Sequence, residues 1–165
     1  MDTNKSVQLD GAIIDLDRNE RQGFPEVVYC EGKTDQQCVD IFMTLQEHYD
    51  TFMGTRARIS IYEALKPHIP DVQYDEMSRI LYVNRNPINR NGERTIAVVT
   101  AGTSDMPVAE EAALTAELMG NKVLRVYDVG VAGIHRLMER LDSIQEANVV
   151  IAVAGMEGAL ASVLG

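Results

Sequence analysis

Three loops in the second half of the chain hold the residue types that could do chemistry. Backbone amides and hydroxyls in the first loop could hold a phosphate or carboxylate, and a carboxylate between glycines in the third is suited to proton transfer. The second loop offers an imidazole and a guanidinium. The candidate residues are Gly102, Thr103, Ser104 and Asp105, then Asp128, His135 and Arg136, then Gly155, Met156, Glu157 and Gly158.

Each of these loops also has a plainer interpretation. Thr103–Asp105 fits ordinary capping of the helix that follows, because hydroxyl and carboxylate side chains are common there. Arg136 fits a solvated helix residue, and His135 fits a local cap. Glu157 fits a partner for a helix dipole. Taken one position at a time, the sequence leaves both interpretations open.

The elements that must position these loops are three apolar runs, each followed by a helical pattern. Ile96–Thr100, Val123–Val126 and Val149–Val153 are continuous and apolar, as strands covered on both faces require. The alternation predicts adjacent parallel strands joined by right-handed crossovers. The carboxyl ends of such strands share one edge, where ligands bind. We therefore expect the three loops to converge.

The helical patterns between the strands have recognisable ends. Asp105 is expected to cap the first helix and Gly120 to end it, and Pro107 suits its first turn. The pattern after the second strand predicts one helix with a single apolar face, formed by Ile134, Leu137, Met138 and Leu141.

The first half of the chain predicts a smaller α/β segment. Glu26–Glu31 is β-branched and aromatic and predicts a strand. Thr34 and Gln37 form a capping-box pattern that opens a helix. Phe52–Arg56 predicts a turn.

The stretch before the domain boundary is less regular. Ala57–Leu65 fits a strand or a helix, and Ile80–Val83 predicts a strand. Asn84–Arg94 has no periodic apolar pattern and contains proline and glycine, so it is the linker candidate. The sequence thus predicts an N-terminal α/β segment over residues 1–86 and a parallel-sheet domain over residues 87–165.

Composition narrows the class of protein. The formal net charge of −10 argues against a broad nucleic-acid or membrane-surface partner, which needs clustered Lys and Arg. No apolar run approaches the ~20 residues that cross a bilayer, and there is no signal-peptide pattern. Cys30 and Cys38 have no metal-ligand spacing with the histidines and are interpreted as core thiols. A cytoplasmic protein with no metal site is expected.

Together the motifs resemble a known family. Gly102-Thr103-Ser104-Asp105, Ala132-Gly133-Ile134-His135-Arg136 and Ala154-Gly155-Met156-Glu157-Gly158-Ala159-Leu160 are similar to the active-site loops of PurE-type aminoimidazole ribonucleotide carboxylases. With Arg21–Tyr29 and Gly32–Thr34, the chain resembles more closely the LarB family of nickel-pincer cofactor biosynthesis. The resemblance runs from about Arg18 onward. It implies an N-terminal α/β segment followed by a partial flavodoxin-like, PurE-like parallel three-layer sandwich. Together with the alternation of strand and helix, it implies that the three strands stand in the order 2-1-3.

The resemblance also implies an activity. LarB proteins carboxylate the pyridinium ring of nicotinic acid adenine dinucleotide at C5 and hydrolyse its phosphoanhydride, giving pyridinium-3,5-biscarboxylic acid mononucleotide and AMP. Glu157, His135 and Asp105 would then be catalytic, and the other loop residues would contact the dinucleotide. Carbon dioxide or bicarbonate is the implied co-substrate, with no tightly bound cofactor and with a divalent cation such as Mg²⁺ left open. A homo-oligomer formed through the PurE-like domain is implied as well.

One departure separates this chain from the family pattern. The family's cysteine nucleophile lies beyond Gly165, and neither Cys30 nor Cys38 matches it. We therefore expect an N-terminal fragment that is inactive in carboxylation and marginally stable or self-associating by itself. Two alternatives stay open. One is a PurE-type carboxylase or mutase, against which Glu157 argues because those enzymes have a smaller residue there. The other is a non-catalytic nucleotide-binding module.

Overall fold

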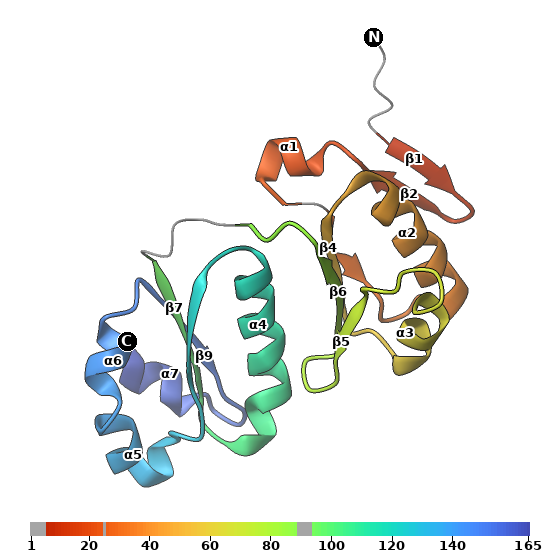
Figure 1. The fold of residues 1–165 in the computed structure, drawn as a ribbon. Coiled ribbons are helices and arrows are strands. Elements are labelled where there is room, and N and C mark those ends of the chain that lie inside the picture. The colour runs from red at the N-terminus through yellow and green to blue at the C-terminus, as the bar shows by residue number, and fades with distance from the viewer. Residues whose placement is uncertain (1–5, 25, 89–93) are drawn as a thin grey trace. The chain divides into compact units, whose positions relative to one another are not determined.

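The structure is a computed structural model that describes the chain except for residues 1–5, 25 and 89–93. The described chain forms two compact units, Met1–Pro87 and Ile88–Gly165 (Figure 1). The predicted linker, Asn84–Arg94, lies partly outside the described residues.

The first unit is built on a four-stranded sheet of order β3-β4-β6-β5. Its strands are β3 (Val28–Tyr29), β4 (Thr51–Thr55), β5 (Gln73–Asp75) and β6 (Ile80–Asn84). β3 lies parallel to β4, and the other pairs are antiparallel. Helices α2 (Asp35–His48) and α3 (Ile59–Leu65) pack on this sheet. Their shared core includes Phe42, Leu45, Phe52, Ile61 and Leu65, all fully buried.

A hairpin and a short helix precede this sheet. β1 (Ser6–Leu9) and β2 (Ala12–Asp15) pair antiparallel, and α1 (Arg18–Gln22) follows and ends at Gly23, whose φ is 75°. The hydroxyl of Tyr49 donates to Leu16 O at 2.6 Å, and Ile14 of β2 is 3% exposed. These contacts attach the hairpin and the segment after it to the core of the unit.

The structure corrects several sequence predictions in this unit. The predicted turn at Phe52–Arg56 is wrong, because residues 51–55 form strand β4, which pairs on both edges and is buried over four of its five residues. The Phe42 ring packs closely against the backbone of Gly54, where an added Cβ would lie 2.6 Å from Phe42 Cζ. The strand predicted over Glu26–Glu31 is shorter, Val28–Tyr29.

Other predictions for this unit are confirmed or decided. The ambiguous stretch Ala57–Leu65 is helical from Ile59. The capping box is confirmed: Gln37 N donates to Thr34 Oγ1 at 3.2 Å, and Thr34 N donates to Gln37 Oε1 at 3.0 Å.

The second unit is a parallel sheet of order β8-β7-β9. Its strands are β7 (Thr95–Thr100), β8 (Lys122–Val126) and β9 (Val149–Val153). β7 is the central strand and pairs in parallel with both neighbours, so the predicted order 2-1-3 is confirmed. The unit is a three-layer α/β sandwich, as the flavodoxin-like prediction requires.

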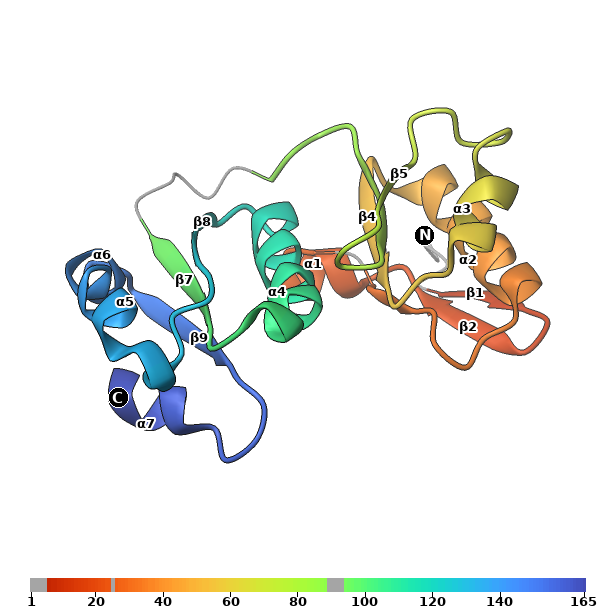
Figure 2. The same cartoon turned by 90° about the horizontal axis from the view of Figure 1, so that it is seen from below.

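Helices cover both faces of this sheet (Figure 2). α4 (Met106–Leu118) lies on one face, where Ala109 and Ala113 pack against Val98. α5 (Ile134–Met138), α6 (Leu141–Gln145) and α7 (Ala159–Leu164) lie on the other face. That second core contains Ala97 and Val99, because successive strand residues point to opposite faces.

The single helix predicted after β8 is wrong. The chain forms two short helices, α5 and α6, with a break at Glu139–Arg140. Leu137 of the predicted face is buried, as is Ile144 of α6, while Ile134 and Met138 of the predicted face are 43% and 58% exposed. In the described part of the chain, no helix has the length and apolar character that a bilayer crossing needs.

Candidate functional site

The loops after the three parallel strands are joined at the end of the central strand. Val129 N donates to Thr100 O at 3.0 Å, and Asp128 N donates to Thr100 Oγ1 at 2.9 Å. On the other side, Ala101 N donates to Val153 O at 3.1 Å. The loop after β7 is therefore hydrogen-bonded to the chain at the ends of both neighbouring strands.

The first loop turns through a single 3₁₀ turn before α4 begins. This turn covers Thr103–Asp105, and Asp105 Oδ2 accepts from Gly102 N at 2.9 Å. The prediction that Asp105 caps α4 is wrong in detail, because its side chain bonds backward to Gly102 and makes no cap hydrogen bond to α4. Thr103 and Ser104 are exposed, so their hydroxyls face solvent.

The third loop lies beside the carboxylate of the first. A Cβ placed on Gly155 would be 3.9 Å from Asp105 Oδ1. Met156 and Gly158 have φ of 52° and 68°, and the Met156 side chain is fully exposed. Left-handed backbone at a non-glycine residue such as Met156 is strained, and such strain often occurs at functional sites. Glu157, between them, is exposed.

The second loop carries an ion pair. Arg136 Nη1 donates to Asp128 Oδ2 at 2.6 Å, and the two side chains are 39% and 50% exposed. Asp128 has a φ of 60°, and its backbone N–H is held by Thr100. The arginine passes over Gly133, where an added Cβ would lie 2.8 Å from Arg136 Nε. His135, on the first turn of α5, is exposed.

Two positioning residues were not among the sequence predictions. Thr100 is fully buried and holds the second loop through its hydroxyl. Gly130 is buried, and an added Cβ would lie 2.6 Å from Ala101 O. A threonine that closes an otherwise apolar strand was the available signal for Thr100. Gly130 gave none, because its importance comes from a contact with a loop distant in sequence.

The structure thus brings Gly102, Asp105 and Gly155 together, and separately pairs Asp128 with Arg136. Among the described residues, no hydrogen bond or ion pair connects His135 or Glu157 to another candidate residue. Both side chains are exposed. No group of three His, Cys, Asp or Glu side chains in the described ranges is placed to hold a metal ion.

Comparison with known proteins gives two findings. Residues 6–85 match the family model described as the LarB/PurE-like N-terminal domain. The chain is also 38% identical over 160 residues to an uncharacterized protein of Methanocaldococcus jannaschii, and that match covers 92% of this chain and 62% of the relative. The chain therefore spans less than two thirds of that relative's length. The family match relates the chain to LarB and PurE-like carboxylases.

Proposed function

We propose that this chain, which belongs to the LarB family through residues 6–85, acts in the carboxylation of the pyridinium ring of nicotinic acid adenine dinucleotide. Hydrolysis of the phosphoanhydride would accompany the carboxylation and release AMP. The product is pyridinium-3,5-biscarboxylic acid mononucleotide. Carbon dioxide or bicarbonate supplies the new carboxylate, and no tightly bound cofactor is needed.

One observation carries this proposal. A LarB-type first unit is followed in the same chain by a parallel sheet with its strand-end loops hydrogen-bonded around the end of β7. The carboxyl edge of an open parallel sheet is the usual place for a ligand. The hydroxyl, carboxylate, imidazole and guanidinium groups in those loops suit a charged nucleotide.

The contacts suggest how the dinucleotide would be held. Gly102 N already donates to Asp105, so the exposed hydroxyls of Thr103 and Ser104 are the freer contacts for phosphate oxygens. Arg136 is held by Asp128 at the surface and can exchange that carboxylate for a phosphate. Such an exchange costs little, because exposed ion pairs contribute only about 0–1 kcal/mol.

Proton transfer is the second task. A pyridinium carbon is electron-poor and attacks carbon dioxide only after a nucleophile has added at C4 and made C5 electron-rich. Loss of the C5 proton and departure of the nucleophile then restore aromaticity. Glu157, His135 and Asp105 are the groups proposed to accept and return protons. Cys30 and Cys38 are not proposed as the nucleophile, because both are fully buried and burial raises the pKa of the Cys30 thiol to about 12.

A homo-oligomer formed through the second unit is part of the proposal. Exposed apolar side chains on that unit support it, including Val149, Val150 and Met138. Light scattering on the protein as it elutes from a size-exclusion column measures the mass of the assembly directly. A monomer at micromolar concentration would contradict this part alone.

The test of the activity follows labelled bicarbonate into product. Full-length protein that carries the family's cysteine nucleophile is incubated with nicotinic acid adenine dinucleotide and ¹³C-bicarbonate, with and without Mg²⁺, and the mononucleotide and AMP are measured by mass spectrometry. The chain through Gly165 alone should give no product. Glu157→Gln should lower kcat by about 100-fold or more if Glu157 transfers a proton. Ser104→Ala should raise KM with less effect on kcat, and Glu146→Gln, an exposed change outside the loops, should do neither.

Three outcomes would count against the proposal. Turnover of aminoimidazole ribonucleotide in place of the dinucleotide would favour the purine carboxylase. Binding of the dinucleotide by the full-length protein with no product would favour a binding module. If Glu157→Gln and Ser104→Ala both had the kcat and KM of the wild type, neither residue would belong to the active site.

A further inference from the structure

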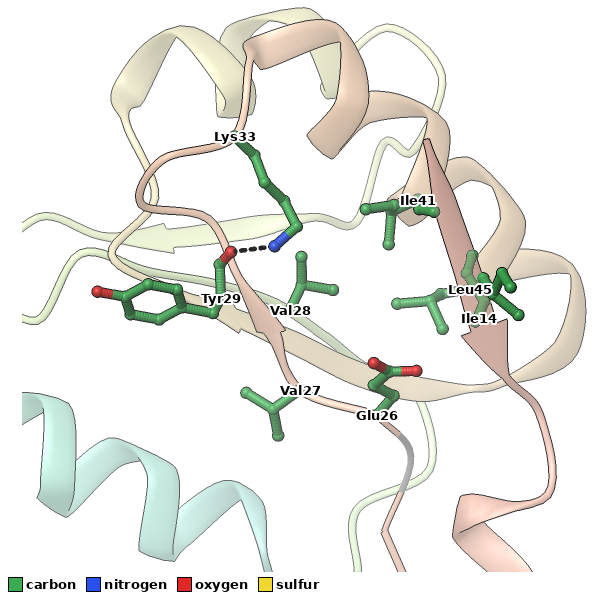
Figure 3. Close-up of a pocket in the computed structure, with 10 residues that line it drawn as sticks. Ile14, Glu26, Val27, Val28, Tyr29, Lys33, Ile41 and Leu45 are labelled. Atoms are coloured by element: carbon green, nitrogen blue, oxygen red, sulfur yellow. Dashed lines mark hydrogen bonds between the residues drawn. The ribbon is translucent and has the colours of Figure 1, made fainter. Parts of the chain in front are cut away.

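The first unit contains a cavity that the proposed carboxylation does not use. It lies between the β1–β2 hairpin, β3 and α2, and its volume is about 310 Å³ (Figure 3). The lining residues are Ala12, Ile13, Ile14, Glu26, Val27, Val28, Tyr29, Lys33, Ile41 and Leu45. All of them belong to the first unit.

Four of the ten residues that line this cavity belong to the core of the unit, whereas Ile13 and Tyr29 are 69% and 51% exposed. Ile14, Val28, Ile41 and Leu45 are 3%, 5%, 7% and 0% exposed, and all four are aliphatic. Protein cores rarely contain voids much larger than a water molecule. A space of this volume falls instead at the lower end of the range of small-molecule sites. The cavity is therefore of the size and apolar character of a ligand site.

Two side chains of opposite charge enter the cavity. Figure 3 shows the Lys33 ammonium and the Glu26 carboxylate both turned toward the space enclosed with Ile14 and Ile41. Lys33 Nζ donates to Tyr29 O at 2.8 Å, and Glu26 Oε2 accepts from Asp15 N at 3.0 Å. An ammonium has three donors and a carboxylate has about four acceptor positions, so each group has hydrogen-bonding capacity beyond these contacts.

The two charges are separated along the cavity. Lys33 Nζ is fixed at Tyr29, three residues along the chain from Glu26. Three residues of extended chain cover roughly 10 Å. The Glu26 side chain turns into the cavity from the segment before β3 (Figure 3). An extended dipeptide spans about 7 Å, which suits such a gap better than the adjacent charges of a single amino acid.

We infer that this cavity binds a small zwitterion with an apolar body and the length of a dipeptide, with its carboxylate at Lys33 and its ammonium at Glu26. The aliphatic walls select apolar side chains, and the two charged groups set the direction of the ligand. This binding is independent of the proposed carboxylation, and its test does not use the dinucleotide.

The first experiment varies the ligand and leaves the protein unchanged. L-Alanyl-L-leucine is titrated by calorimetry beside its N-acetyl form, its C-terminal amide and free L-leucine. The unmodified dipeptide should bind best. Removal of either charge should weaken binding by about 10-fold or more, because each charge-assisted hydrogen bond contributes strongly at a partly buried site. Equal affinity for all four compounds, or no binding at millimolar concentration, would overturn the inference.

The second experiment varies the protein. Lys33→Met should bind the dipeptide and its amide equally, because the group that distinguishes them is gone. Lys66→Met is the matched control: it loses a similar lysine-to-carbonyl bond, Lys66 Nζ to Val72 O at 3.2 Å, outside this cavity, and should bind as the wild type does. Glu26→Gln keeps an acceptor for Asp15 N and should lose discrimination against the N-acetyl form.

Methyl NMR then locates the ligand. Saturating dipeptide should shift the methyl signals of Ile14, Val28 and Ile41 and leave those of Leu137 and Leu160, in the core of the second unit, unchanged. Shifts confined to the second unit, or full discrimination retained in Lys33→Met, would contradict the assignment.

Discussion

The contact between the loops after β7 and β8 can be tested at Gly130. Its φ of −62° and ψ of 154° are open to any L-residue, so the backbone conformation does not require glycine. The neighbours do require it. An added Cβ would lie 2.6 Å from Ala101 O and 3.2 Å from Ala101 C, which are backbone atoms and cannot rotate away. Gly130→Ala must therefore push the two loops apart.

The expected cost follows from that overlap. Overpacking a rigid site costs about 1–3 kcal/mol. Separation of the loops would also strain the bond from Val129 N to Thr100 O, now 3.0 Å long. For a chain of about 150–250 residues, each kcal/mol lowers Tm by roughly 2–4 °C. Gly130→Ala should thus lower Tm by several degrees, and urea unfolding should give a matching loss of free energy.

Gly133→Ala is the control in the same loop. Its added Cβ would lie 2.8 Å from Arg136 Nε, the far end of a flexible side chain, which can swing aside. The ion pair that Arg136 would give up is exposed and contributes about 0–1 kcal/mol. Gly133→Ala should therefore melt closer to the wild type than Gly130→Ala does. If Gly130→Ala melted at the wild-type temperature, the loop contact would be refuted.

Three further predictions concern other parts of the chain. Asp128→Asn should cost less than about 1 kcal/mol of stability, because the ion pair with Arg136 is exposed. The same variant should bind the dinucleotide more tightly, because it frees Arg136 and removes a negative charge, whereas Arg136→Gln should bind it more weakly. Calorimetry of the two variants must therefore give changes in binding free energy of opposite sign. Burial raises the pKa of Cys30 from 9.0 to about 12, so between these pH values the unfolded chain loses the thiol proton while the folded protein keeps it. The free energy of unfolding should therefore fall as pH rises from 9 toward 12. Urea titrations over this pH range should show a smaller fall in the free energy of unfolding for Cys30→Ala than for the wild type. Gly54→Ala should cost about 1–3 kcal/mol in urea unfolding, since the added Cβ would lie 2.6 Å from Phe42 Cζ, and a cost near zero would contradict the packing of β4.

Parts of the fold could be predicted because the relevant signals are local. The capping box needs only Thr34 and Gln37, three residues apart, and the structure confirms both of its bonds. The parallel strands of the second unit are short apolar runs, although of the three only β7 is largely buried; β8 has one buried residue and β9 has none. Their order 2-1-3 was expected from the alternation of strand and helix together with the flavodoxin-like resemblance. Both cysteines were expected in the core and are fully buried.

Other features escaped prediction because their causes are distant in sequence. Phe52–Arg56 contains a glycine and was predicted to be a turn, yet its pairing with β3 and β6 makes residues 51–55 a central strand. Asp105 was expected to cap α4, but the 3₁₀ turn before that helix directs its carboxylate to Gly102. The predicted apolar face after β8 is confirmed only at Leu137, because Ile134 and Met138 are exposed and α6 buries Ile144 in place of Leu141.

The sequence by itself determined which residues could do chemistry and that they follow parallel strands, because residue type and hydrophobic period are local properties. Only the tertiary structure decided which of these residues touch. It paired Asp128 with Arg136, set Gly155 beside Asp105 and made Thr100 and Gly130 the contacts between loops. The physical reason is that these contacts depend on strand register and loop geometry. The positions of the contacting atoms must be set to within a fraction of an atomic diameter. That precision comes from the packing of the whole unit, which no single segment of the sequence specifies.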